Sequence, residues 1–226
     1  MEPLYRVRTS KRAKRLALRL DPIERVFELV VPSRCSMKSA YKFADQHEDW
    51  MAARINDLPT PVPFQHGSTL PLNGSNVEIS LKIDPNRKNI SVHLSEKKIE
   101  VLSPHEDISA RVKRWLKKYA KDILEDLSKE KAQLINKQVQ SVSVRDTKSR
   151  WGSCSSDGSL SYSWRLIFAP PEAIDYVVGH EVAHLVHLDH SKDFWKLCRE
   201  LSENFVDGQY WMRNHGQELM KYGAIT

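Results

Sequence analysis

The sequence has little cysteine and no long apolar run. Its 226 residues include three cysteines, Cys35, Cys154 and Cys198, and no two of them form a CxxC pair. This spacing excludes a zinc ribbon and a disulfide framework, and the odd number fits a reducing compartment. No apolar stretch reaches the ~18 residues of a transmembrane helix, and the basic start lacks a signal-peptide pattern. We therefore expect a soluble, cytoplasmic protein with no membrane partner; the oligomeric state stays open.

Charge of one sign is not in large excess either. The chain has 35 Lys and Arg against 29 Asp and Glu, a net charge of +6. A local basic run comprises Arg6, Arg8, Lys11, Arg12, Lys14, Arg15 and Arg19. No interleaved aromatic residues or known nucleic-acid module accompany this run, so a solvated strand face is favoured. Phosphate contacts by a non-catalytic nucleic-acid-binding module remain an alternative.

Apolar periodicity and turn signals predict a β-rich first part and an α+β second part. Two strands are expected within residues 4–31, a helix over 37–58, and four strands between 64 and 102. Beyond these, the patterns predict a long helix over 108–135, a strand over 139–144, a hairpin over 150–168, and helices over 170–188 and 191–204. The predicted fold is α+β, with an accessory region at 1–105 and a catalytic domain at 106–226.

The most informative segment is His180-Glu181-Val182-Ala183-His184, which fits the HExxH pattern. Histidines four residues apart on a helix differ by ~40° and ~6 Å, so both can direct an imidazole at one ion. Glu181 can reach a water in the open position and act as a general base, while the ion lowers that water's pKa toward ~7. The segment predicts a zinc ion on His180 and His184; incidental histidines on a surface helix are the alternative.

A catalytic zinc ion needs a third protein ligand, for which His187, His190 and Glu200 are candidates. His187 lies one turn further along the expected helix, and three ligands in a row on a straight helix cannot easily converge. His190 follows the expected helix end, where the chain can fold back toward the ion. This geometry favours His190 and leaves His187 beside the ligands or exposed.

Further motifs flank this helix. They are Lys148-Ser149-Arg150-Trp151-Gly152-Ser153-Cys154 before it, and Leu188-Asp189-His190-Ser191 and Phe194-Trp195 after it. Together they resemble the YgjP-like metallopeptidase domain, and the HExxHxxxxxH spacing is similar to that of SprT and WLM zinc metalloproteases. The resemblance implies a zincin-like domain with zinc on His180, His184 and His190 and Glu181 as the catalytic residue. It implies a peptide or protein substrate, although some members are described as nucleotide pyrophosphatases.

Candidate substrate contacts precede the helix. Lys148 and Arg150 can bind an anion, although the alternative is a structural turn with Trp151 in the core. Ser163 stands where many relatives have Asn, and is expected near the cleft. Together with Arg165, Lys148 and Arg150 would bind phosphates if the protein were a UTP-type pyrophosphatase. The leading prediction is a zinc metallopeptidase, with the pyrophosphatase as its main alternative.

The hairpin expected over 150–168 gives two further predictions. Residues 159–163 can form an edge strand that receives an extended peptide, with an ordinary hairpin as the alternative. Cys154 is expected to be a small buried thiol, although it can also approach the metal.

Overall fold

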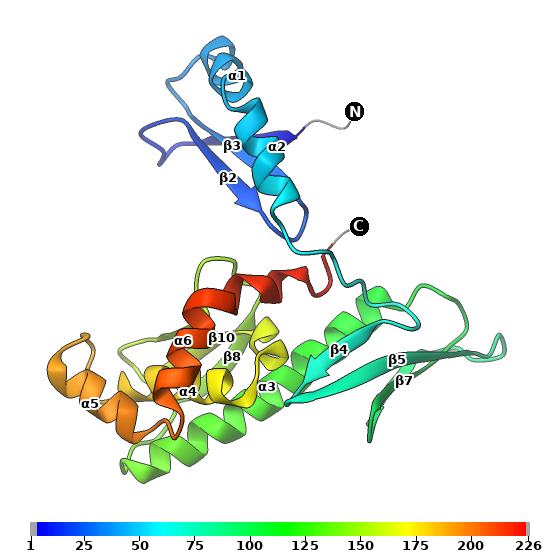
Figure 1. The fold of residues 1–226 in the computed structure, drawn as a ribbon, viewed down its shortest axis with the longest axis vertical. Helices are drawn as coiled ribbons and strands as arrows, with labels where there is room; N and C mark the ends of the chain where they lie inside the picture. The colour runs from blue at the N-terminus through cyan, green and yellow to red at the C-terminus, as the bar shows by residue number, and fades with distance from the viewer. Residues whose placement is uncertain (1–3, 225–226) are drawn as a thin grey trace. The chain divides into compact units, whose positions relative to one another are not determined.

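A computed structural model describes residues 4–224. The chain forms two compact units (Figure 1). Unit 1 extends to Pro61 and includes the last residues from Gly223, and unit 2 is Val62–Tyr222. Sheets and helices occur in both units, so the predicted α+β fold is confirmed. Within residues 4–224, no helix combines the length and apolar character that crossing a membrane requires.

The described residues of unit 1 form a small sheet of three strands, one more than predicted, with two helices. Its elements are β1 (Tyr5–Ser10), β2 (Ala17–Asp21), β3 (Val26–Pro32), α1 (Met37–Asp45) and α2 (Glu48–Asn56). The central strand β3 is parallel to β1 and antiparallel to β2. Leu29 and Val31 of β3 pack against Ala40 and Ala44 of α1, which explains the apolar run that the sequence shows there.

The single helix predicted over 37–58 is wrong, because the chain breaks between α1 and α2. His47 donates its backbone N–H to the Ala44 carbonyl, while its ring Nδ1 lies 2.7 Å from the Phe43 carbonyl oxygen. A continuing α-helix would instead bond the His47 N–H to the Phe43 carbonyl. The side chain of His47 therefore takes the acceptor that the next helical turn needs.

Part of the basic run in unit 1 is paired within its sheet. Arg6 lies 3.2 Å from Asp21 and Arg8 lies 2.8 Å from Glu28, with both arginine side chains about half exposed. Lys11, Arg12 and Lys14 lie on the exposed connection between β1 and β2. Nucleic-acid binding by this run stays a prediction.

Unit 2 contains two sheets. Strands β4 (Thr69–Leu72), β5 (Ser75–Ile83), β6 (Ser91–Ser95) and β7 (Lys98–Ser103) have the order β4-β5-β7-β6. Asn73 and Gly74, with φ of 50° and 78°, form the tight turn between β4 and β5 that the sequence predicts. The second sheet, β8 (Ser141–Arg145), β9 (Gly152–Cys154) and β10 (Ser159–Ser163), has the order β8-β10-β9.

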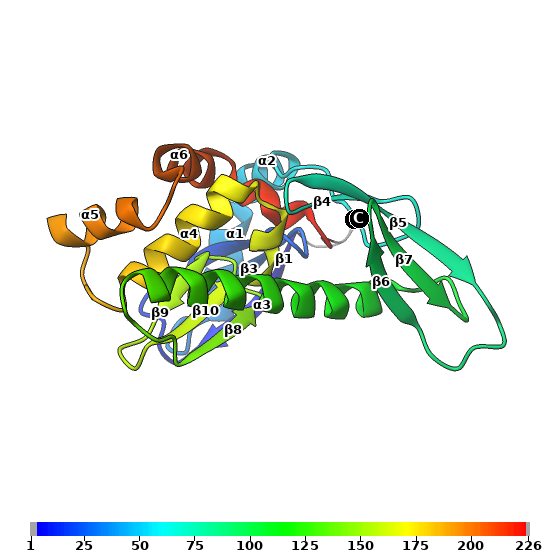
Figure 2. The same cartoon turned by 90° about the horizontal axis from the view of Figure 1, so that it is seen from below.

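The helices of unit 2 connect these sheets through one core. They are α3 (Ser109–Leu134), the 3₁₀ turn η1 (Trp164–Phe168), α4 (Pro171–Ala183), α5 (Lys192–Glu200), α6 (Phe205–His215) and the 3₁₀ turn η2 (Gly216–Lys221). Figure 2 shows α3 extending from the four-stranded sheet to α4. Ile79 and Ile99 of that sheet share one buried cluster with Val112 of α3 and Val178 of α4. The boundary predicted at residue 105 lies inside this unit, and the accessory role of 1–105 stays a prediction.

Two elements around the HExxH segment differ from the prediction. Helix α4 ends at Ala183 and not near Leu188, because the backbone N–H groups of Leu185 and Val186 bond carbonyls three residues back. Residues 164–168 form the turn η1 instead of completing a hairpin strand. Helix α6 was not predicted.

Close packing of α4 against α6 depends on glycine. A methyl group built on Gly208 of α6 would overlap the Glu172 carbonyl oxygen and the Tyr176 Cβ of α4. One on Gly179 of α4 would overlap the Ser202 hydroxyl. Gly208 thus lets α6 lie against the helix that carries the HExxH histidines, and Gly179 lets the segment between α5 and α6 do the same.

The first prediction concerns Gly208→Ala. In an exposed helix this change usually stabilises by about 1 kcal/mol, because alanine loses less backbone entropy. Here the overlap with backbone should reverse the sign and lower the free energy of unfolding by about 1–3 kcal/mol. Urea denaturation measures this, and Val206→Ala, exposed on the same helix, should cause no loss. A stabilised Gly208→Ala protein would contradict the close packing.

Candidate metal centre

Three histidines come together at the end of α4. His180 lies in the last turn of the helix, His184 is its C-terminal cap, and His190 comes from the loop before α5. One ligand atom of each lies within 4.8 Å of the others. The Nε2 atoms of His180 and His190 are 3.2 Å apart. The chain therefore folds back after the helix and brings His190 to the HExxH pair.

This arrangement fits a metal ion. Two nitrogen ligands at Zn–N distances of 2.0–2.1 Å and a tetrahedral angle would be ~3.3 Å apart, close to the spacing of the two Nε2 atoms. Imidazole is a ligand that zinc, copper, iron and nickel all accept, so the donor set does not select one metal. Among residues 4–224, the three histidines are the one group of His, Cys, Asp and Glu with ligand-like spacing. His187 and Glu200 are outside it.

Neighbouring groups orient the three rings. Nδ1 of His184 lies 2.9 Å from the carbonyl oxygen of His187, which requires a proton on Nδ1 and leaves Nε2 with a free lone pair. Residue 187 thus contributes its backbone to the cluster and not its ring. Phe194 of α5 is fully buried, with its ring centroid 4.5–4.9 Å from all three imidazoles. The Phe194-Trp195 motif alone does not indicate this packing role, because it depends on the loop that brings His190 back to the helix.

The electrostatic environment keeps the helix histidines neutral. Burial, with His184 and His190 nearby, lowers the pKa of His180 to about 4. Burial also lowers the pKa of His184. A neutral imidazole has the lone pair that a metal ligand needs, so both rings are suited to metal binding at neutral pH.

Glu181 projects beside this cluster from the same helix. Its side chain is only 6% exposed. Burial raises the pKa of its carboxyl group to about 7, although the nearby Arg150 lowers it in part. A methyl group on Gly152 of β9 would overlap the Glu181 carboxylate. The glycine of the Trp151-Gly152 motif therefore lets strand β9 lie directly against the candidate base, a role that its motif alone did not indicate.

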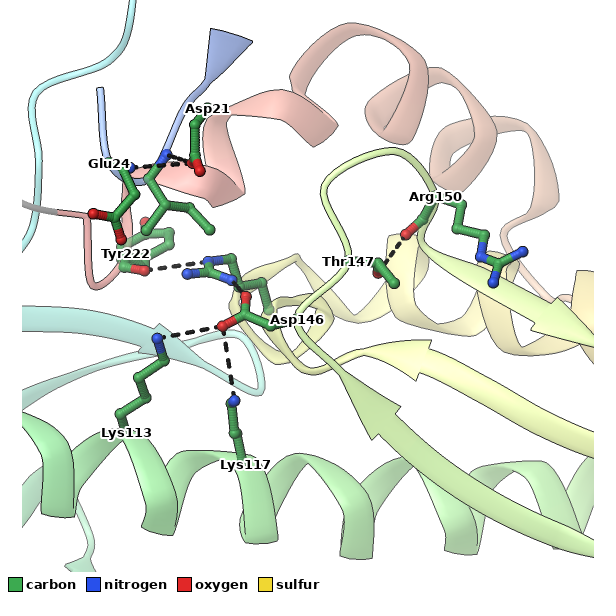
Figure 3. Close-up of polar contacts among 10 residues, drawn as sticks. Asp21, Glu24, Lys113, Lys117, Asp146, Thr147, Arg150 and Tyr222 are labelled. Carbon is green, nitrogen blue, oxygen red and sulfur yellow. Dashed lines mark hydrogen bonds and ion pairs between the residues drawn. The ribbon is translucent and has the colours of Figure 1, made fainter. Parts of the chain in front are cut away.

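An ion network anchors the loop that precedes β9 (Figure 3). Asp146 pairs with the guanidinium of Arg165 and with Lys113 and Lys117 of α3, at 3.3 and 3.7 Å for the lysines. The Arg165 Nε also donates to the Tyr222 carbonyl at 3.3 Å. Burial would raise the pKa of Asp146, but Arg165 and Lys113 outweigh it and hold the pKa at about 2. The network fixes where the β8–β9 loop leaves its sheet.

The same loop positions Arg150. The Thr147 hydroxyl donates to the Arg150 carbonyl at 2.8 Å, which closes the loop on itself. Figure 3 shows the Arg150 side chain directed away from Asp146. It lines a cavity of about 280 Å³ together with Glu181 and the three histidines. Of the candidate substrate contacts, Arg150 is the one that the fold brings to the histidine cluster.

Two of the predicted substrate contacts are buried in the structure. The side chain of Arg165 is 0% exposed and belongs to the Asp146 network, because η1 turns residues 164–168 into the core. Ser163, also 0% exposed, immediately precedes this turn, and its buried hydroxyl has no hydrogen-bond partner in the described chain. Lys148 is exposed on the β8–β9 loop, and its contact with substrate stays a prediction.

The strand predictions near the site also change. The 159–163 strand, β10, lies in the middle of its sheet, so it is not the edge that the sequence predicted. The edge strands are β8 and β9, and residues Gly152, Ser153 and Cys154 of β9 line the histidine cavity. Cys154 is half-buried, and burial raises the pKa of its thiol to about 11.

The second prediction concerns Asp146→Asn. Because the folded pKa of about 2 lies below the ordinary 3.8, this carboxylate stabilises the fold above pH ~4 and loses that effect as the pH falls through 2. The variant should lose about 2 kcal/mol of unfolding free energy at pH 7, and the difference should shrink toward pH 2. Urea denaturation across this pH range measures it, with the exposed Asp122→Asn as a control. A pH-independent difference would contradict the ionic role.

Comparisons with known proteins agree with this site. A family model described as YgjP-like, metallopeptidase domain, matches residues 14–215. No curated protein and no solved structure matches the chain. The matched family implies a metal ion and a hydrolase activity, and the three-histidine cluster can bind such an ion. Because the match covers most of the sequence, the chain belongs to the YgjP-like metallopeptidase domain family.

Proposed function

We propose that this protein is a zinc-dependent peptidase in which His180, His184 and His190 hold the metal and Glu181 is the general base. The observation that carries the proposal is a buried carboxyl group beside three converging imidazole nitrogens. When bound, zinc would supply a Lewis acid that polarises the scissile carbonyl and acidifies the attacking water. The protein's own residues then have to orient the peptide and move one proton.

Glu181 would carry that proton. Its carboxylate takes a proton from water as the water oxygen attacks the carbonyl carbon. The resulting carboxylic acid gives the proton to the amide nitrogen as the C–N bond breaks, which leaves a new carboxyl group and a free amine. A group that both accepts and donates a proton works best when its pKa is near the working pH, and burial moves Glu181 in that direction.

Strand β9 would align the peptide. Within the described chain it has a strand partner on one side only, and its residues 152–154 line the histidine cavity. An extended peptide can add to such an edge through backbone hydrogen bonds. A nucleotide has no comparable backbone, and the burial of Arg165 removes one of the phosphate contacts that a pyrophosphatase would need. These observations favour a peptide substrate.

The third prediction tests the base. Glu181→Gln should retain zinc, because no ligand changes, and lose about 10²- to 10⁴-fold in turnover. Zinc content is measured by elemental analysis, and turnover by digestion of denatured proteins alongside release of pyrophosphate from nucleoside triphosphates. The exposed Glu200→Gln is the matched control. A fully active Glu181→Gln protein would refute the mechanism, and pyrophosphate release without peptide cleavage would refute the substrate class.

The fourth prediction separates the metal ligands. His190→Ala should lower zinc occupancy about as much as His184→Ala does, because each removes one of three nitrogens. His187→Ala should retain zinc, since His184 contacts the main-chain carbonyl of residue 187 and that carbonyl remains. Zinc titration with a colorimetric chelator measures all three. Loss of zinc in His187→Ala with normal binding in His190→Ala would reverse the assignment.

A further inference from the structure

A second cavity, of about 700 Å³, adjoins the histidine cavity. The two share Arg150, Gly152, His180 and Glu181, so they meet at residues that include the proposed base. The larger cavity extends away from the histidines, between α4, the start of β9 and α6. A group in this cavity would therefore lie next to the bond that Glu181 acts on.

Helix α6 gives this cavity an apolar wall. Val206, Tyr210 and Arg213 are spaced by four and three residues, which places them on one helical face, and all three line the cavity. Val206 is 72% exposed and Tyr210 is 65% exposed, although both are apolar or aromatic. Trp151 and Val177 line the cavity as well. Covering this wall with an apolar group would remove aromatic and aliphatic surface from water, which favours binding.

The charges around the cavity have one sign apart from Glu181 itself. Arg150 and Arg213 line it, and both are exposed. No other Asp or Glu of the described chain is among the residues that line it. An apolar wall with two arginine side chains complements a ligand that has an apolar body and a carboxylate, because guanidinium groups bind carboxylates in bidentate geometry.

We infer that this cavity, lined by Tyr210, Val206, Arg150 and Arg213, is the specificity subsite, and that it takes a large apolar side chain next to the scissile bond together with a nearby carboxylate. The inference rests on the proposed peptidase function. The carboxylate can come from the free C-terminus of a peptide or from an Asp or Glu side chain. Both sources offer the same chemistry to the arginines. The subsite lies beyond the metal ligands and the base, and selects which peptides reach them.

The test uses matched short peptides that differ at two places. One position carries Phe or Ala, and the C-terminus is a free carboxylate or an amide. A further pair of peptides carries Glu or Gln at an internal position, which distinguishes a side-chain carboxylate from the C-terminal one. Tyr210→Ala should lower kcat/KM for the Phe peptides about tenfold, mainly through KM, and leave the Ala peptides unchanged. Arg213→Gln should lower kcat/KM only for peptides with a carboxylate. Asn214→Ala, exposed on α6, and Arg34→Gln, exposed in unit 1, are the controls.

Measuring peptide binding in a variant without turnover tests the subsite separately from the proposed peptidase function. Fluorescence anisotropy of dye-labelled peptides on zinc-loaded Glu181→Gln protein should show the same preference for Phe and carboxylate, and Tyr210→Ala should remove the preference for Phe. Peptide binding with this preference but no cleavage by the wild type would refute the peptidase function and keep the subsite. Cleavage with equal kcat/KM for Phe and Ala peptides would overturn the subsite and keep the function. If the Glu181→Gln variant binds nucleoside triphosphates and shows no preference among the peptides, the subsite is overturned as well.

Discussion

The burial of α4 is the constraint on which the site depends. Ala173, Val177, Val178 and Val182 lie in the common core of unit 2, so the helix is covered on most sides. His180 and Glu181 lie where the core leaves the helix open to the histidine cavity. Glu181, although 6% exposed, borders that opening. The same burial that stabilises the helix removes water from the carboxyl group and raises its pKa.

Two elements meet α4 at distances that a side chain larger than hydrogen would not permit, and a third packs against it through an aromatic ring. Gly208 lets α6 approach the start of the helix, and Gly152 lets β9 lie against Glu181. Phe194 of α5 fills the space behind the three imidazoles. Each contact comes from a different part of the sequence after residue 150. The size of the residue at each of these places therefore determines how closely the neighbouring elements pack against α4.

Charge performs a separate task at the β8–β9 loop. Asp146 forms ion pairs with Arg165 of η1 and with two lysines of α3. It lies at the start of the loop that contains Arg150. A fully buried guanidinium without its carboxylate would be costly, so the pair holds the loop to the core. Arg150 and Arg165 are both arginines near the HExxH helix, yet one is directed to the cavity and the other fixes the loop.

The sequence by itself determined the two histidines of the HExxH pattern, the glutamate between them and the α+β class, because these depend on local spacing and periodicity. It also favoured His190 over His187, since a residue beyond a helix end can fold back. Only the tertiary structure decided where α4 ends, that β10 is a central strand and β9 an edge strand, and that Arg165 and Ser163 are buried. Each depends on contacts between residues far apart in the sequence, such as Arg165 with Tyr222, which no local pattern encodes.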